Sequence, residues 1–279
     1  MSEYSKKIDN ALKICKLAEE EALAHNEPVE VCYSGGKDSD VILQLSKMAG
    51  IRYRAIYKNT TIDPPGTLQH VKNNNVDIVN PRRSFFEIIK KKGLPSFKFR
   101  FCCSELKEYK ILNVSILGIR REESSKRKLM YTTFEQCRHY TKNVIVRQYF
   151  PILDWNINDI KKFVIEENIQ LAPIYYTNGV LDITRRLGCM GCPLAGNKIK
   201  DFLSNKNFLR AYLRAGAEYA KKHNKNIYEL FLFQLFFSSL IEMKDFLYRN
   251  VQNEMRDPKT EIENFFNIKL PDYEKITTK

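Results

Sequence analysis

The sequence predicts an α/β protein, with a doubly wound, mostly parallel sheet followed by a helical C-terminal extension. Two observations predict this class. Short β-rich segments alternate with helical segments through residues 5–168, and such alternation is typical of parallel sheets with right-handed crossovers. After Gly196 the pattern becomes helical and rich in aromatic residues. We therefore expect one domain at residues 1–196 and a helical region at residues 197–279 that packs on it.

The individual elements follow from residue spacing and from turn residues. Helices are expected at residues 5–24, 38–50, 66–74 and 156–168. Strands are expected at the β-rich runs 29–34, 51–59, 76–80, 113–119 and 143–153. Because ligands of such sheets bind at the carboxyl ends of the strands, functional residues should follow these runs.

The composition indicates a cytoplasmic protein. The first twenty residues lack the uninterrupted apolar segment of a signal peptide. The seven cysteines form an odd set in a chain long enough to fold without disulfides, which is typical of a reducing compartment. The apolar run LFLFQLFFSSLI at residues 230–241 is too short to cross a bilayer. We expect it to form a buried helix or a contact in a homo-oligomer, and we expect no membrane association.

The positive charge is concentrated in one part of the chain. The formal net charge is +13, and residues 82–128 hold fourteen Lys or Arg against five Asp or Glu. Such a concentration favours a polyanionic partner, either nucleotide phosphates or a DNA or RNA acceptor. A solvated basic surface is the alternative.

The segment SGGKDS, residues 34–39, lies between a predicted strand and a predicted helix, as an anion-binding loop does. The two glycines allow the backbone N–H groups to approach a phosphate, Lys37 adds a positive charge, and Asp38 either caps the helix or orients a metal ion. A Walker A pattern is absent. The predicted phosphate-binding residues are Ser34, Gly35, Gly36, Lys37, Asp38 and Ser39.

This segment resembles the pyrophosphatase (PP) loop of the adenine nucleotide α-hydrolase superfamily, and two further motifs resemble its phosphoadenylyl sulfate reductase branch. GIRREESSKR, residues 118–127, is similar to a motif of that branch, and PILDWNINDI, residues 151–160, is similar to the segment after its core strand. The resemblance covers residues 28–196 and implies an adenine nucleotide α-hydrolase-like fold. The residues that match the first motif are Gly118, Arg120, Glu123, Ser124 and Arg127. The resemblance implies that Gly118, Glu123 and Ser124 bind the nucleotide cofactor.

Four cysteines are arranged as an adjacent pair, Cys102 and Cys103, followed at a distance by Cys189 and Cys192 in a CxxC. From the ligands alone, a structural zinc site is favoured over an iron–sulfur site. The spacing resembles the branch members that carry a [4Fe–4S] cluster, and this resemblance implies a cluster held by these four thiolates.

The three remaining cysteines have other expected places. We expect Cys15 and Cys32 to be small core residues, because they lie on a helix face and inside a strand. Three places are open for Cys137, namely the surface, the core and the neighbourhood of the nucleotide site.

Two departures from the reductases bear on the reaction. The chain has no cysteine after Cys192. The adenylyl sulfate reductases that it resembles carry a catalytic cysteine in a C-terminal segment. NTTIDPPGTLQ, residues 59–69, lacks the Phe-Pro-Glu core of the corresponding reductase segment. The resemblance and these departures together imply an ATP-binding PP-loop enzyme that carries a [4Fe–4S] cluster and transfers sulfur. They favour this reaction over the reduction of a sulfonucleotide.

In this hypothesis an acceptor, such as DNA or RNA, is adenylated as pyrophosphate leaves, and sulfur comes from a donor protein such as a cysteine desulfurase. Lys37 and the loop hold the phosphates of ATP or an adenylyl sulfate-type nucleotide, Mg²⁺ bridges these phosphates, and Arg120 and Arg127 neutralise the leaving charge. The expected catalytic residues are Lys37, Asp38, Arg120 and Arg127.

Three alternatives remain open. The first is a reductase that makes sulfite, with Cys137 as its nucleophile. The second is a non-catalytic nucleotide- and DNA-binding subunit of a modification or defence complex. The third is an adenylyltransferase, which gives the four cysteines no role.

Overall fold

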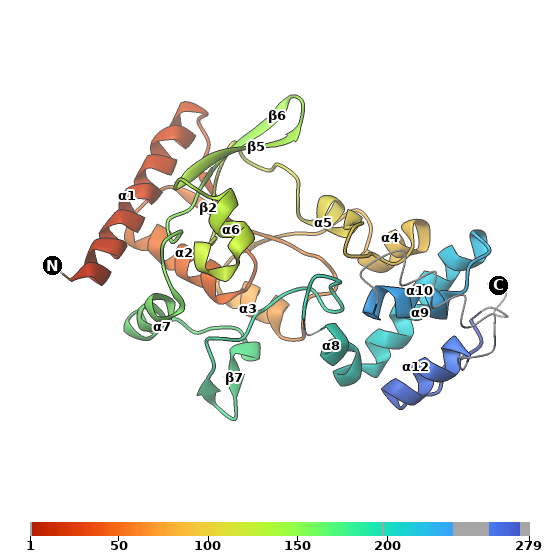
Figure 1. The fold of residues 1–279 in the computed structure, drawn as a ribbon. Coiled ribbons are helices and arrows are strands. Elements are labelled where there is room, and N and C mark those ends of the chain that lie inside the picture. Colours follow the sequence, from red (N-terminus) through yellow and green to blue (C-terminus); the bar gives the residue numbers. More distant parts are fainter. Residues whose placement is uncertain (1, 197, 237–256, 274–279) are drawn as a thin grey trace. The chain divides into compact units, whose positions relative to one another are not determined.

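The computed structural model describes residues 2–196, 198–236 and 257–273 and divides into two compact units (Figure 1). The first unit comprises Met1–Asn59, Asp63–Asn80 and Lys107–Gly188. The second comprises Thr60–Ile62, Pro81–Leu106 and Cys189–Lys279. The predicted boundary after residue 196 differs from this division, because residues 81–106 belong with the C-terminal helices rather than with the sheet.

The first unit contains a six-stranded, mostly parallel sheet, which confirms the predicted fold class. The strand order is β3-β2-β1-β4-β6-β5, and only β5 runs antiparallel to its neighbour, as part of an edge hairpin with β6 (Figure 1). A small second sheet pairs β7 with β8. The strands are β1 (Val29–Tyr33), β2 (Tyr53–Lys58), β3 (Asp77–Val79), β4 (Val114–Ile116), β5 (Glu135–Thr141), β6 (Val144–Tyr149), β7 (Tyr176–Thr177) and β8 (Val180–Leu181).

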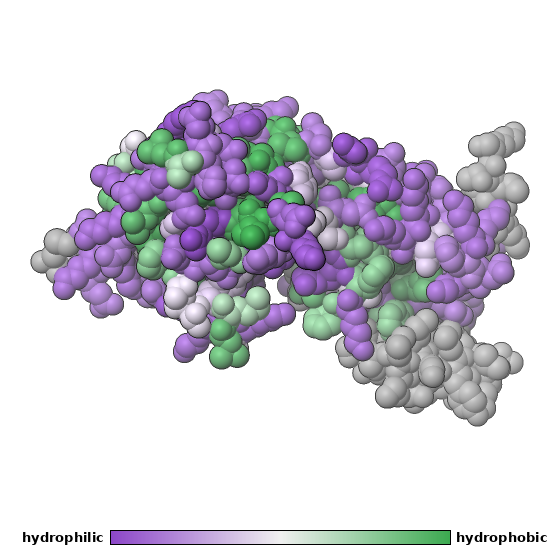
Figure 2. Space-filling view, turned by 90° about the horizontal axis from the view of Figure 1, so that it is seen from above, coloured by the Kyte–Doolittle hydropathy of each residue, from purple (hydrophilic) through white to green (hydrophobic). Residues whose placement is uncertain are grey.

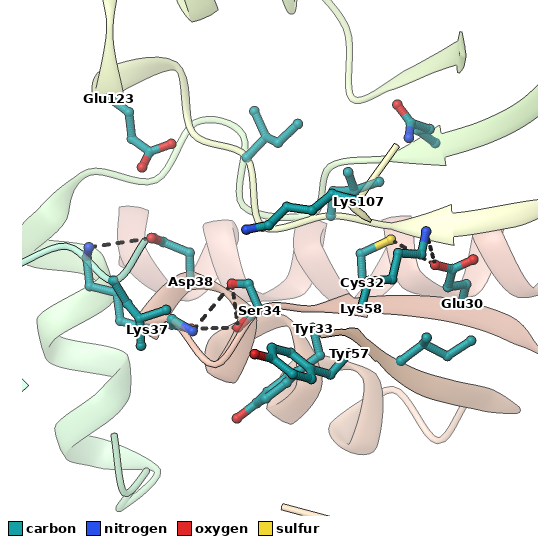
Figure 3. Close-up of a pocket in the computed structure, with 18 of the residues that line it drawn as sticks. Glu30, Cys32, Tyr33, Ser34, Lys37, Asp38, Tyr57, Lys58, Lys107 and Glu123 are labelled. Atoms are coloured by element: carbon teal, nitrogen blue, oxygen red, sulfur yellow. Dashed lines mark hydrogen bonds and ion pairs between the residues drawn. The ribbon is translucent and has the colours of Figure 1, made fainter. Parts of the chain in front are cut away.

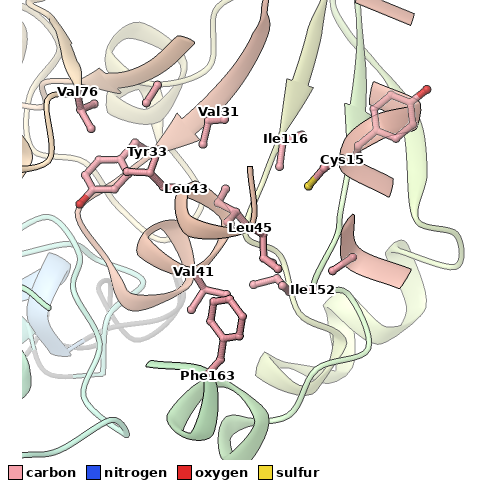
Figure 4. Packing of buried hydrophobic residues seen from close by; sticks show 14 of the residues in the cluster. Cys15, Val31, Tyr33, Val41, Leu43, Leu45, Val76, Ile116, Ile152 and Phe163 are labelled. Atoms are coloured by element: carbon pink, nitrogen blue, oxygen red, sulfur yellow. The ribbon is translucent and has the colours of Figure 1, made fainter. Parts of the chain in front are cut away.

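Helices cover one face of this sheet and form the core of the first unit with it. Figure 4 shows Val31 of β1 and Ile116 of β4 packing on α2 and on Cys15 of α1, with Phe163 of α7 on the far side of α2. Trp155 is also buried here. The helices of the first unit are α1 (Glu3–Ala24), α2 (Lys37–Met48), α3 (Thr67–Asn73), α6 (Ser125–Met130) and α7 (Ile157–Glu166), with 3₁₀ turns η1 (Arg121–Glu123) and η2 (Pro173–Tyr175).

The second unit is helical and has an aromatic core of its own. Phe202 is fully buried and contacts four aromatic rings, those of Phe208, Tyr212, Phe231 and Phe266. The described helices are α4 (Phe85–Lys92), α5 (Phe101–Leu106), α8 (Lys198–Ser204), α9 (Lys206–Lys222), α10 (Ile227–Phe236) and α12 (Pro258–Phe266).

The apolar run at 230–241 falls partly in α10, where Phe231, Leu232 and Leu235 are buried as predicted. Its residues 237–241 lie outside the described residues. No helix in the described ranges is long and apolar enough to cross a bilayer. Hydrophilic residues make up most of the face seen in Figure 2.

Candidate active site

The phosphate loop joins the end of β1 to the start of α2, as predicted. Gly35 has φ +76°, a conformation that favours glycine, and a Cβ atom there would lie in tight contact, 3.1 Å from Cγ2 of Thr67. Gly36 is the N-cap of α2 and has no side chain to occupy the first N–H groups. The predicted capping by Asp38 does not occur, because Asp38 is the second residue of the helix. The N-terminus of α2 is thus suited to accept an anion.

Lys37 lies at the base of this loop and is only 4 % exposed. Its Nζ is 3.5 Å from the Asp38 carboxylate and donates to the Arg185 carbonyl at 3.3 Å. Burial lowers the pKa of Lys37, whereas Asp38 opposes that shift. The Lys37 N–H donates to the Tyr175 hydroxyl at 3.0 Å. Burial raises the pKa of Tyr175 to about 12, so the phenol stays neutral.

Arg120 contacts Asp38 and does not face the space in which a ligand would bind. Its Nε donates to Asp38 at 2.7 Å and its Nη1 to Glu122 at 2.6 Å, and the side chain is buried. Gly118 brings the end of β4 against the loop, because a Cβ atom at this position would lie 2.7 Å from the Asp38 carbonyl oxygen. Both residues therefore position the start of α2.

A second group of charges surrounds Glu123. Its carboxylate pairs with Arg127 and, at 3.3 Å, with Arg186. Both guanidinium groups thus lie beside one carboxylate. Burial and the nearby Arg186 charge both lower the pKa of Arg127. Two like charges beside one carboxylate leave a net attraction for a polyanion. Ser124, predicted to bind the cofactor, instead caps α6 by accepting from the Arg127 N–H, and it is exposed.

These residues surround a cavity of about 540 Å³ that lies within the first unit (Figure 3). One end, which we call the loop end, is formed by Ser34, Gly36, Lys37, Asp38, Ser39, Gly118, Glu123, Arg127 and Arg186. The other, the sheet-face end, is formed by Glu30, Cys32, Ile56, Lys58, Leu117, Tyr140 and Gln148. In Figure 3 Lys107 extends between the two ends. Of the predicted residues, Gly35, Arg120 and Ser124 do not line the cavity.

Sequence reasoning missed several residues of the site. Tyr175, Arg186 and Lys107 come from loops or a 3₁₀ turn and belong to no phosphate-binding pattern. A buried network beneath the loop was also missed, in which the Tyr33 hydroxyl donates to Asp40 and His70 Nε2 lies 2.9 Å from the same carboxylate. Burial raises the pKa of Asp40.

The structure brings the four predicted metal-ligating cysteines into the second unit. Cys102 and Cys103 lie on α5, and Cys189 and Cys192 precede α8. A hydrogen bond with Cys103 and burial raise the pKa of Cys102, as do the charges of Cys189 and Cys192. Among the described residues no three His, Cys, Asp or Glu side chains are arranged as metal ligands. Four cysteine thiolates are nevertheless a donor set that either a cluster or zinc accepts.

The turn within the CxxC is built for close packing. Gly191 has φ +65°, and a Cβ atom there would lie 2.6 Å from Cζ of Phe202. Its N–H donates to Asp201 at 2.9 Å. Only glycine therefore allows this turn to pack against Phe202 of the aromatic core, on which Cys189 also packs.

The other cysteines lie in different surroundings. Cys15 is fully buried, as predicted. Cys32 is not a core residue, because it lines the sheet-face end and its Sγ is 3.5 Å from the Glu30 carboxylate. Burial and Glu30 raise the pKa of Cys32 well above its usual value. Cys137 is exposed on β5 and does not line the cavity.

The Gly118→Ala substitution should loosen the loop. The added methyl group would displace the Asp38 backbone, and we expect the free energy of unfolding to fall by about 1–3 kcal/mol. ATP binding should weaken as well. Gly196→Ala is the control, because nothing lies within 4 Å of the added atom. Chemical denaturation of both variants measures the difference, and equal stability would contradict the close approach.

Two uncharacterized proteins of Methanocaldococcus jannaschii are similar to the chain. MJ0973 is 30% identical over 200 residues, covering 67% of this chain and 46% of the relative. MJ0066 is 27% identical over 225 residues, covering 71% and 43%. The chain thus spans less than half the length of these curated relatives.

Solved structures of three kinds are similar at low sequence identity. Candida glabrata FMN adenylyltransferase is 17% identical, covers 62% of this chain and 58% of its own, and gives a TM-score of 0.43. Phosphoadenylyl-sulfate reductase of Candida auris, in a phosphate complex, is 18% identical with coverages of 63% and 94% and a TM-score of 0.41. The U34-tRNA thiolase NcsA of Methanococcus maripaludis, with its [4Fe-4S] cluster, is 14% identical with coverages of 75% and 76% and a TM-score of 0.33.

The match to a protein family is more extensive. The phosphoadenosine phosphosulfate reductase domain family matches residues 28–195, which include the whole phosphate loop and every residue of the cavity. This match extends over more than half of the chain. The chain therefore belongs to the phosphoadenosine phosphosulfate reductase domain family, whose members are nucleotide-binding enzymes of the PP-loop type.

Proposed function

We propose that this enzyme binds ATP at the loop end, cleaves it between the α- and β-phosphates, and adenylates an acceptor that then receives sulfur. The observation that carries the proposal is the loop end itself. There the N-terminus of α2, whose N-cap residue Gly36 has no capping side chain, and Lys37 line the same cavity as Arg127 and Arg186. A polyphosphate is the ligand that satisfies such a concentration of donors and positive charge.

The proposed roles follow from the contacts. The loop N–H groups and Lys37 hold the phosphates that leave, and Arg127 and Arg186 neutralise the charge that develops on them. Arg120, which the sequence suggested for this task, instead holds Asp38 and thereby orients the start of α2. Asp38 and Glu123 are both occupied by ion pairs. We therefore assign the Mg²⁺ that accompanies ATP to phosphate oxygens.

The four cysteines of the second unit are proposed to hold a [4Fe–4S] cluster, with zinc as the alternative. When bound, such a cluster supplies sulfur-handling or electron-transfer chemistry, whereas zinc supplies structure. The chain contributes the four thiolates, the tight turn at Gly191 and the apolar packing of Cys102 and Cys189.

A nucleic acid is the proposed acceptor. Lys126 and Lys128 are exposed on α6, the helix that places Arg127 in the cavity. Arg138, His139 and Lys142 are exposed on the hairpin of β5 and β6. These residues provide a basic surface next to the cavity, and a phosphate backbone is attracted to such a surface.

The test is anaerobic incubation of the reconstituted protein with ATP, a cysteine desulfurase with cysteine, and either tRNA or DNA. We expect pyrophosphate release and sulfur incorporated into the nucleic acid, both dependent on ATP. Incorporation into neither nucleic acid, in the absence of pyrophosphate release, would refute the proposal. Nucleotide binding without turnover in any combination would favour the non-catalytic subunit instead.

The contacts of the cysteines disfavour a sulfite-forming reductase. Such a reaction needs a thiolate at the ligand, yet Cys137 does not line the cavity and the pKa of Cys32 is raised. We expect no sulfite from adenylyl sulfate or phosphoadenylyl sulfate with a thiol reductant. Sulfite release that is lost in Cys137→Ser would reverse this assignment.

Lys107→Ala should weaken ATP binding by about tenfold, because a cation within the cavity is removed. Figure 3 shows the Lys107 side chain directed toward the loop end. Lys142→Ala, an exposed lysine of the hairpin, should leave ATP affinity unchanged and serves as the control. Calorimetric titration with ATP measures both, and equal affinities would remove Lys107 from the site.

A further inference from the structure

The sheet-face end of the cavity is polar where a sheet of this kind is normally apolar. Central strands of parallel sheets are buried on both faces and usually consist of continuous apolar residues. In β1, Val29 and Val31 face the core, whereas Glu30 and Cys32 line the cavity. Glu30 is only 2 % exposed. A buried carboxylate at this place requires an explanation beyond packing.

The two ends of the cavity differ in charge. At the sheet-face end, Lys58 pairs with Glu30 at 3.2 Å, and the Leu112 N–H donates to the same carboxylate at 3.2 Å. Arg138 and Glu108 also line the cavity, and they pair with each other at 3.3 Å. Each charge at this end is therefore compensated, whereas cations exceed carboxylates at the loop end. One cavity thus favours an anionic group at one end and an uncharged polar group at the other.

The amide of Gln148 indicates which kind of uncharged group binds at the sheet-face end. Its side chain lies on β6, is 5 % exposed and lines the cavity. The Gln148 Oε1 accepts from Gln136 Nε2 at 3.3 Å, which orients the amide. Within the described part of the chain, no residue accepts a hydrogen bond from Gln148 Nε2. Gln148 Nε2 is not among the buried unpaired polar atoms and Gln148 lines the cavity, so this donor is available to a ligand that accepts a hydrogen bond from it.

The remaining lining suits a flat heterocycle. Ile56 and Leu117 present apolar surfaces, and Tyr140 adds a phenol whose pKa is raised to about 12 by burial and so remains a neutral donor. A glutamine amide pairs with the edge of adenine by donating to N7 and accepting from N6. We propose that the sheet-face end is a nucleobase subsite read by Gln148. This inference rests on the proposed function, and the base belongs either to ATP or to a nucleic-acid acceptor.

Calorimetric titration of the full-length chain distinguishes these two sources. The variant is Gln148→Leu, which removes the amide at nearly constant volume. The ligands are ATP, tripolyphosphate and a single-stranded RNA oligonucleotide added with a non-hydrolysable ATP analogue. If the base is that of ATP, the variant should bind ATP about tenfold more weakly and tripolyphosphate unchanged. If it is that of the acceptor, ATP affinity should persist while the RNA binds about tenfold more weakly.

Two further variants separate recognition from folding. Gln136→Leu releases the orientation of the Gln148 amide and should give a smaller loss with the same ligand. Gln69→Leu makes the same chemical change at an exposed position of α3 and should change nothing. Unchanged affinity of Gln148→Leu for both ATP and RNA would overturn the inference alone, as would a parallel loss for ATP and tripolyphosphate. Absence of ATP binding by the unaltered chain would overturn the proposed function as well.

Discussion

The Lys37→Ala variant is expected to lose nucleotide turnover by about a hundredfold or more, since it removes the buried positive charge that is proposed to hold the phosphates. Lys37 begins α2, and its ammonium group is held by Asp38 and the Arg185 carbonyl within the loop end. Its pKa is lowered by burial. Its charge therefore begins to be lost at a lower pH than in a free lysine, and turnover should decline earlier on the alkaline side.

Two controls make this result specific. Lys47 is exposed in the last turn of the same helix, so the Lys47→Ala variant should retain full activity. Lys37→Arg keeps the charge but not the shape of the ammonium group, so it should recover part of the binding and little of the turnover. Pyrophosphate release measured at several pH values compares all three. Full activity of Lys37→Ala would mean that the loop does not hold the reacting phosphates.

Replacing any one of Cys102, Cys103, Cys189 and Cys192 by Ser should abolish stoichiometric metal loading, because each is proposed to supply one ligand. The protein reconstituted under anaerobic conditions should be brown and contain about four irons per chain. Metal binding also contributes to folding free energy. The variants should therefore unfold at lower temperature than the loaded protein, with the loss confined to the second unit.

Cys137→Ser provides the matched control for the cysteine variants. This thiol is exposed on β5 in the first unit and should be replaceable with no change in iron content. A colourless protein with one zinc per chain would make the four cysteines a structural site. Undiminished iron in all four variants would contradict the ligand assignment altogether.

The sequence was sufficient for the parts of the fold that depend on local pattern. The runs VEVCY and YRAIYK form β1 and β2, and the Ser-Gly-Gly turn lies where a phosphate loop must lie. α4 was missed although its signal was present, since Ser84 and Glu87 form a capping box. β5 was missed because EQCRHYT is an edge strand without a buried apolar face, and so it lacks the alternation that marks a strand.

The candidate site was predicted where residues are adjacent in sequence and missed where they meet only in the fold. Ser34, Lys37 and Arg127 were found from motifs, and all three line the cavity. Tyr175 and Gln148 reach the same cavity from distant segments, and only their tertiary position gives them a role. Arg120 matched a motif, but the structure shows its guanidinium occupied by Asp38 and Glu122. A motif identifies a residue without showing which contacts it makes.

The central claim is that the loop end directs cleavage to the bond between the α- and β-phosphates of ATP. The most direct measurement is incubation of the reconstituted protein and acceptor with ATP labelled at the α-phosphate, followed by separation of the labelled products. The account predicts label in AMP or in an adenylated acceptor, with one pyrophosphate released for each. Label recovered in ADP, with phosphate instead of pyrophosphate, would contradict it.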